Sequence, residues 1–205
     1  MVSNQERINV LKDKAKELRK TALTMIHEAN SGHPGGSLSA ADIMAALYFY
    51  ELKLDPKNPG WYERDRFVLS KGHVCPILYS SLILRGFMDK KEIYNLRKYK
   101  SRLQGHPDMK KTPGVDISTG SLGQGISTAV GMALGLKRDG IDSRVFCLVG
   151  DGETNEGQVW EAVQTAVKYG LDNMVIFVYN NRIQNDGFCD EIMPVLDLKE
   201  KFQAF

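Results

Sequence analysis

The sequence predicts an α/β fold with a central parallel sheet, and three consecutive segments carry this prediction. Two apolar runs, Val145–Val149 and Met174–Tyr179, lack the alternation of half-exposed strands, as is typical of strands buried in a parallel sheet. Between them, Glu156–Lys168 repeats apolar side chains near the 3.6-residue period of a helix that packs on a sheet. This order of strand, helix and strand predicts a right-handed crossover unit.

The remaining elements are predicted from periodicity, caps and turn residues. Ser39 is the expected N-cap of a helix that runs through Phe49. The other predicted helices and strands, in chain order, are a helix over 4–30, a turn at 32–36, a strand over 66–69, helices near 74–84 and 90–94, and a closely packed Gly- and Ala-rich helix over 123–136. Loops are expected over 54–63 and 100–122. Without a repeat or a dividing linker, we expect one domain over residues 1–205.

Composition excludes several classes of function. The 205 residues are 42% hydrophobic and 25% charged, with a formal charge of +2 that is too small to indicate nucleic-acid binding. The sequence has no apolar run of about 18 residues, so no membrane span is predicted, and its charged N-terminus does not resemble a secretory signal. The 3 cysteines lack metal-ligand spacing. Reduced thiols in a cytoplasmic protein are the simplest interpretation.

Two oxygen-bearing side chains follow the two apolar runs. Asp151 stands between Gly150 and Gly152 after the first run, and Asn181 comes shortly after the second. Ligands of parallel sheets collect where the carboxyl ends of the strands converge, and flanking glycines let a phosphate approach the backbone. Carboxylate and amide oxygens suit a hard cation such as Mg²⁺. The alternative is that both segments are ordinary turns.

Three of the 4 histidines lie in turns that contain Gly or Pro. His33, His73 and His106 are therefore candidates for side chains aimed into a cleft, whereas His27 is assigned to helix packing or to the surface. Imidazole titrates near neutral pH and both donates and accepts hydrogen bonds. A group of histidines consequently suits recognition of sugar hydroxyls and proton transfer. Solvated loop histidines are the simpler alternative.

Together these segments resemble the thiamine diphosphate-dependent enzymes, and more narrowly transketolase. The match consists of Gly150–Gly152 with Asn181 and four further segments in the family's order, Ser31–Gly35, Asp65–His73, Gly105–Pro107 and Gly120–Gly125. The resemblance covers nearly the whole chain. It implies a three-layer α/β/α arrangement, the diphosphate-binding fold of the family, which would be incomplete at the C-terminus of this sequence.

The resemblance also implies roles for particular residues. The metal ligands would be Asp151, Asn181 and the carbonyl of Ile183, and the metal would be Mg²⁺, with Ca²⁺ or Mn²⁺ as substitutes. The cofactor contacts would be His73, Gly120, Ser121, Leu122, Gly152 and Asn181. His33 and His106 would bind the reacting end of the sugar, with His73 near the diphosphate and thiazolium. Glu156 would couple paired active sites at a subunit contact, although an acid near a helix N-terminus is favoured by the helix dipole in any case.

The implied activity is transfer of a two-carbon ketol unit between sugar phosphates in the pentose phosphate pathway. Members of the family also need a glutamate of a pyrimidine-binding domain, which has no counterpart here. The chain therefore resembles the N-terminal subunit of a split transketolase, inactive without a C-terminal partner subunit and expected in a two-plus-two assembly. The alternatives are a half-subunit of a deoxyxylulose-phosphate synthase-like or phosphoketolase-like enzyme, or a non-catalytic cofactor-binding or regulatory subunit. Departures from the family pattern occur at Arg182, Cys75–Pro76 and Asn185.

Overall fold

The computed structural model describes residues 3–205, and the chain divides into two compact units. The first, here called the helical unit, comprises the residues up to Arg64 together with His73–Ser118. The second, here called the sheet unit, comprises Asp65–Gly72 together with Thr119–Phe205. Each unit is described by itself. That residues 1–205 act as one diphosphate-binding domain stays a prediction.

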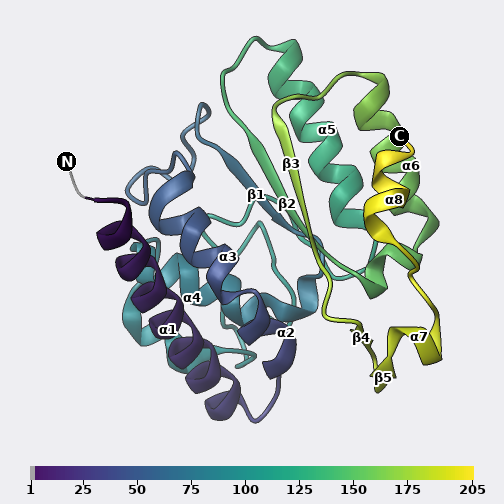
Figure 1. Ribbon diagram of the computed structural model, residues 1–205. Coiled ribbons are helices and arrows are strands. Elements are labelled where there is room, and N and C mark those ends of the chain that lie inside the picture. Colours follow the sequence, from purple (N-terminus) through teal and green to yellow (C-terminus); the bar gives the residue numbers. More distant parts are fainter. Residues whose placement is uncertain (1–2) are drawn as a thin grey trace. The chain divides into compact units, whose positions relative to one another are not determined.

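The helical unit is built around α1 (Asn4–Ala29), which packs against α3 (Ala41–Ala46) and α4 (Cys75–Arg85) (Figure 1). A capping box starts α1: the Ser3 hydroxyl accepts from the Glu6 backbone N–H, and the Glu6 carboxylate accepts from the Ser3 N–H. The helix ends at Asn30, which adopts the left-handed conformation. Its buried face includes Leu18 and Met25, both fully enclosed. The predicted helix over 4–30 is confirmed.

The segment after α1 differs from the prediction. A short helix, α2 (Pro34–Ser39), begins inside the expected turn, because proline at a first helical position supplies a suitable φ angle and needs no N–H partner. Ser39 ends α2, and its hydroxyl donates back to the carbonyl of Gly36 at 2.9 Å. The prediction that Ser39 caps the next helix was therefore wrong. After α3, the chain continues as a π-helix, Leu47–Glu51.

The rest of the helical unit follows the predicted order. The loop over 54–63 contains only turns, and α4 covers the helix expected near 74–84. The helix expected near 90–94 is a 3-10 helix, Lys90–Asn95. The long loop expected over 100–122 contains no regular element. None of the helices in the described part of the chain is long and apolar enough to cross a bilayer.

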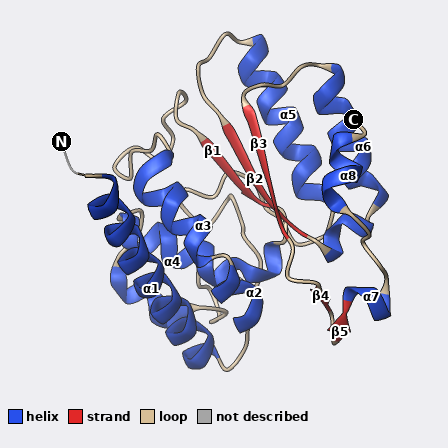
Figure 2. Ribbon diagram, viewed as in Figure 1, coloured by secondary structure: helices blue, strands red, loops and turns tan. Residues whose placement is uncertain are grey.

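The sheet unit contains three parallel strands in the order β1 (Arg66–Leu69), β2 (Val145–Gly150) and β3 (Met174–Tyr179). The strands run side by side, with α5 (Gln124–Arg138) and α6 (Gly157–Lys168) beside them (Figure 2). The predicted α/β fold with a parallel sheet is confirmed. β2 is buried, but every residue of β3, which lies at one edge of the described sheet, is only partly buried. The expectation of two buried strands was thus wrong for β3.

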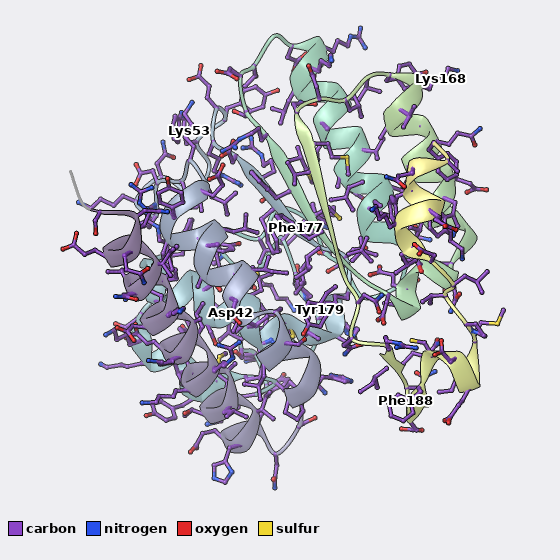
Figure 3. All side chains as sticks on the ribbon, in the orientation of Figure 1. Asp42, Lys53, Lys168, Phe177, Tyr179 and Phe188 are labelled. Atoms are coloured by element: carbon purple, nitrogen blue, oxygen red, sulfur yellow. The ribbon has the colours of Figure 1, made fainter. Side chains whose placement is uncertain are left out.

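The chain after β3 forms elements that the sequence patterns do not predict. Two short strands, β4 (Ile183–Gln184) and β5 (Gly187–Phe188), pair as an antiparallel hairpin from which Phe188 projects (Figure 3). They are followed by α7 (Cys189–Ile192) and α8 (Leu198–Gln203). A small apolar cluster of Cys189, Val195 and Leu198 packs with Trp160 and Val178. This cluster holds the chain end against α6 and β3.

Candidate functional site

The carboxyl edge of the sheet unit brings the two predicted oxygen ligands to neighbouring strand ends. Gly150 pairs with Tyr179 across β2 and β3, and the Asp151 N–H donates to the carbonyl of Tyr179 at 3.1 Å. The Asp151 carboxylate is buried, with its residue 3% exposed, and accepts from the Arg182 N–H at 2.6 Å. Because Arg182 lies between Asn181 and Ile183, this bond places all three predicted metal ligands at one edge of the sheet.

The donors around Asp151 do not use every lone pair of its carboxylate. Oδ1 of Asp151 accepts from the Gly152 N–H at 2.9 Å, and Oδ2 accepts from Arg182 and from the Cys189 thiol at 3.6 Å. A carboxylate offers about four lone-pair positions, so at least one stays available. The Asn181 side-chain oxygen accepts from the Ile183 N–H at 3.0 Å, which uses one of its two lone pairs. One charged oxygen and two neutral carbonyl oxygens fit a hard divalent cation that completes its shell with phosphate and water.

Among residues 3–205, no three His, Cys, Asp or Glu side chains are grouped so that they could hold a metal ion by themselves. The predicted ligand set contains only one such side chain, Asp151, with an amide and a backbone carbonyl. It therefore matches Mg²⁺ chemistry, in which the protein supplies few ligands, rather than a His- or Cys-rich centre.

Glycines at this edge allow neighbouring backbone segments to pack closely around the proposed diphosphate site. A Cβ atom on Gly152 would lie 2.8 Å from Cβ of Gln184, so this close approach of the turn to β4 requires glycine. A Cβ on Gly72 would meet the Gly120 nitrogen at 2.8 Å. Gly120 therefore lies directly against the end of the β1 segment, while Ser121 and Leu122 beside it are exposed. The predicted cofactor loop and diphosphate turn thus both belong to the sheet unit.

Two buried charges at this edge were missed by sequence reasoning. Lys71 is 5% exposed, and its ammonium lies 4.7 Å from the centroid of the Tyr179 ring. Burial lowers the pKa of Lys71 to about 8, against the opposing effect of the negative charges of Asp151 and Glu153. Glu153 is 3% exposed, and burial raises its pKa despite hydrogen bonds to the carboxylate. A charged residue directly before Gly72 and an acid directly after Gly152 were the available signals.

Glu156 lies near this edge but is exposed. It is the N-cap residue of α6, its side chain makes no capping hydrogen bond, and the helix begins one residue later than predicted. A Cβ on Gly123, whose φ is +79°, would lie 2.8 Å from the Glu156 Cβ. Because Glu156 is exposed and its side chain makes no capping bond, this residue is accessible to solvent in this chain. Its role in a subunit contact stays a prediction.

The helical unit brings the three candidate histidines together. The rings of His33 and His73 lie edge to face with centroids 5.1 Å apart. Burial lowers the pKa of His106, and the nearby charges of Arg97 and His33 lower it further. His106 is therefore neutral at neutral pH, so it can both donate and accept hydrogen bonds. His27 is exposed in the last turn of α1, in agreement with its surface assignment.

Arg97 is a residue that sequence reasoning missed in the helical unit. It donates to the Ser31 hydroxyl at 3.0 Å, next to the turn of His33. A Cβ on Gly105 would lie 3.0 Å from the Arg97 guanidinium carbon, so Arg97 also contacts the turn of His106. Tyr79 secures that turn from α4, because its hydroxyl donates to the carbonyl of His106 at 2.9 Å. No sequence pattern marks Arg97, since its partners are distant in the chain.

A parallel sheet with oxygen ligands and glycine turns at its carboxyl edge is typical of α/β proteins that bind phosphate groups. A family model described as the thiamine diphosphate binding domain of transketolase matches residues 10–205. The chain therefore belongs to the transketolase family, which confirms the resemblance drawn from its motifs.

Individual relatives agree with this assignment. The chain is 46% identical to the 6-deoxy-6-sulfo-D-fructose transketolase subunit SqwG of a Clostridium species, over 95% of this chain and 71% of the relative. It is 37% identical to one subunit of the apulose-4-phosphate transketolase of Phocaeicola vulgatus, over 97% of this chain and 70% of the relative. A crystal structure of transketolase from Campylobacter jejuni matches with a TM-score of 0.91 and 38% identity, over 96% of this chain and 32% of that chain.

Proposed function

We propose that this chain is the diphosphate-binding part of a split transketolase. With thiamine diphosphate, Mg²⁺ and a C-terminal partner subunit, it transfers a two-carbon ketol unit from a ketose phosphate to an aldose phosphate. The observation that carries the proposal is the bond from the Arg182 N–H to the Asp151 carboxylate, which gathers the three oxygen ligands beside Gly152. The two relatives whose names call them transketolase subunits support the split arrangement.

Each candidate site residue of the sheet unit has a defined role in this proposal. Asp151, Asn181 and the carbonyl of Ile183 hold the cation, and Gly152 admits the diphosphate. The Lys71 ammonium supplies positive charge at the same edge, which favours a bound anion. Gly120, Ser121 and the exposed Leu122 border the aminopyrimidine. When bound, thiamine diphosphate supplies the carbon nucleophile that this protein cannot provide.

The histidines of the helical unit act on the sugar. His33 and His106 orient hydroxyl groups at its reacting end, and the neutral His106 can accept a proton from a hydroxyl. His73, whose ring contacts His33, is assigned to the diphosphate and thiazolium of the cofactor in this proposal. Glu156 would help couple two active sites in a two-plus-two assembly. The three buried free thiols support a cytoplasmic location.

The sugars are best tested as a panel, since the relatives carry different substrate names. One is named for 6-deoxy-6-sulfo-D-fructose and another for apulose 4-phosphate. The purified chain, with and without its partner subunit, is incubated with thiamine diphosphate, Mg²⁺ and ribose 5-phosphate. Xylulose 5-phosphate and the two named sugars serve as alternative donors.

Two-carbon transfer only in the presence of both subunits is the expected result. Transfer by the chain alone would contradict the split-enzyme proposal. Cofactor binding without transfer from any donor in the assembled complex would instead indicate a non-catalytic binding subunit.

A further inference from the structure

A buried carboxylate joins three segments at the carboxyl edge of the sheet unit. Oε1 of Glu153 accepts from the Ser70 hydroxyl at 2.6 Å and from the Gly123 N–H at 2.9 Å. Oε2 accepts from the Gly150 N–H at 3.1 Å. Ser70 follows β1, Gly150 ends β2, and Gly123 is the N-cap residue of α5. One side chain therefore connects two strand ends and the start of a helix.

The backbone around these bonds has no spare room. A Cβ on Gly125 would lie 2.6 Å from the Ser70 Cα, and a Cβ on Gly72 would lie 2.8 Å from the Gly120 nitrogen. The loop that ends at Gly123 is thus seated directly on the segment after β1. Because Glu153 also holds Gly150, its carboxylate sets how far this loop lies from the turn at 150–152.

Burial of a carboxylate removes it from water, which costs free energy. An ionised group taken out of water needs compensating hydrogen bonds or a nearby opposite charge. Glu153 has three donors, two of them backbone N–H groups, and Lys71 is the neighbouring cation. An apolar side chain would fill the same space without that cost, but it could not fix the two backbone segments in register.

We propose that Glu153 is a positioning residue that sets the spacing between the loop 120–122 and the turn 150–152, so that both ends of thiamine diphosphate are bound at once. The inference rests on the proposed function, in which the loop borders the aminopyrimidine and the turn holds the diphosphate. In this proposal Glu153 has no contact with the aminopyrimidine or with the diphosphate. Its effect is on the joint binding of the two ends of the cofactor, rather than on either end alone.

The test compares two ligands in the assembled enzyme by titration calorimetry, both with Mg²⁺ present: thiamine diphosphate and inorganic pyrophosphate. The variant is Glu153→Asp, which keeps a carboxylate at position 153. Its shorter side chain withdraws that carboxylate by one C–C bond, about 1.5 Å, from Ser70 and Gly123. The matched control is Glu161→Asp, the same change at an exposed position of α6. Thermal unfolding of each variant verifies that it folds.

Glu153→Asp is expected to weaken thiamine diphosphate binding about tenfold, while pyrophosphate binding changes less than about twofold. Ser70→Ala, which removes one donor and keeps the carboxylate, should shift the ratio of the two affinities in the same direction by a smaller factor. Glu161→Asp should leave the ratio unchanged.

Equal loss of both affinities, or no loss of either, would overturn the positioning role and leave the proposed function standing. If Glu153→Asp does not fold, an unchanged ratio in Ser70→Ala overturns the inference. Failure of the unaltered enzyme to bind either ligand would refute the proposed function itself, and this inference with it.

Discussion

At the scale of single residues, the site depends on side chains that fix backbone segments. Asp151 is a predicted metal ligand, yet two of the three hydrogen bonds of its carboxylate are to backbone N–H groups. Arg97 acts similarly on the two histidine turns of the helical unit. The sequence indicated Asp151 through its flanking glycines, because turn chemistry is local. It could not indicate Arg97, whose contacts depend on tertiary packing.

Asp151→Ala removes the only charged oxygen of the proposed metal site. We expect Mg²⁺-dependent binding of thiamine diphosphate to weaken by about 100-fold or more, since loss of a residue that only supports a metal ligand already costs about 10–100-fold. His33→Ala should instead slow two-carbon transfer while cofactor affinity stays within about threefold. Titration of cofactor with and without Mg²⁺ measures the cofactor affinity of both variants, and a two-carbon transfer assay measures the rate of His33→Ala. Asp142→Ala, at an exposed loop position, is the control. Undiminished binding in Asp151→Ala would refute the metal assignment.

Arg97→Met should raise the pKa of His106. Burial is the larger cause of the lowered pKa of His106 and remains, but the positive charge of Arg97 is removed. A lowered pKa means that the folded chain binds a proton at His106 less readily than the unfolded chain does. The contribution of His106 to the free energy of unfolding is therefore fully present above the ordinary histidine pKa. That contribution is lost as pH falls through the lowered value.

Nuclear magnetic resonance titration of the His106 ring measures this shift directly. Arg138→Met, in the last turn of α5, is the matched control and should leave the His106 titration in place. A His106 pKa that is unchanged or lower in Arg97→Met would contradict the proposed contact.

At the scale of elements, periodicity and caps located most helices and strands, whereas local side-chain bonding changed their ends. The helix over 4–30 and the strand over 66–69 were predicted closely, because each has a strong pattern or clear flanking turns. Ser39 was misassigned because its hydroxyl bonds back to Gly36 within α2. The hairpin β4–β5 is too short to leave a pattern in the sequence.

The glycines of α5 differ in what they contact. The close packing predicted for this helix holds at Gly125, where a Cβ would lie 2.6 Å from the Ser70 Cα, but a Cβ on Gly131 would contact nothing within 4 Å. Gly125→Ala should therefore lower the free energy of unfolding by about 2 kcal/mol or more, because backbone must move. Gly131→Ala should raise it by about 0.5–1 kcal/mol through helix propensity. Chemical denaturation measures both, and equal effects at the two positions would contradict this description of α5.

At the scale of the whole molecule, the sequence predicted the fold class from two apolar runs and the helical pattern between them, and it predicted the family from five ordered segments. Its expectation of a uniformly buried β3 was wrong, since burial of a strand depends on which elements flank it. The buried pair of Lys71 and Glu153 was also missed. Charged residues are usually exposed, and only the assembled sheet edge encloses these two.

Chemical labelling of the three cysteines can test whether each unit is folded, because both units contain buried cysteines. Cys75 belongs to the helical unit, and Cys147 and Cys189 belong to the sheet unit; all three are buried and free. Burial raises the pKa of the Cys75 thiol to about 12 and also raises the pKa values of the other two. Because thiolate is the reactive form, we expect Ellman's reagent to label the folded chain at least about 100-fold more slowly than the denatured chain. Fast labelling of one cysteine in native buffer would show that its unit opens.

The division into two units has a consequence for anyone who wishes to study them separately. The backbone passes from one unit to the other after Arg64, again after Gly72 and a third time after Ser118. No single cleavage or gene truncation therefore releases either unit as a continuous polypeptide. A protease that nicks the chain at one of these passages would leave two pieces that both contribute to the same core, so nicked protein should stay associated until it is denatured.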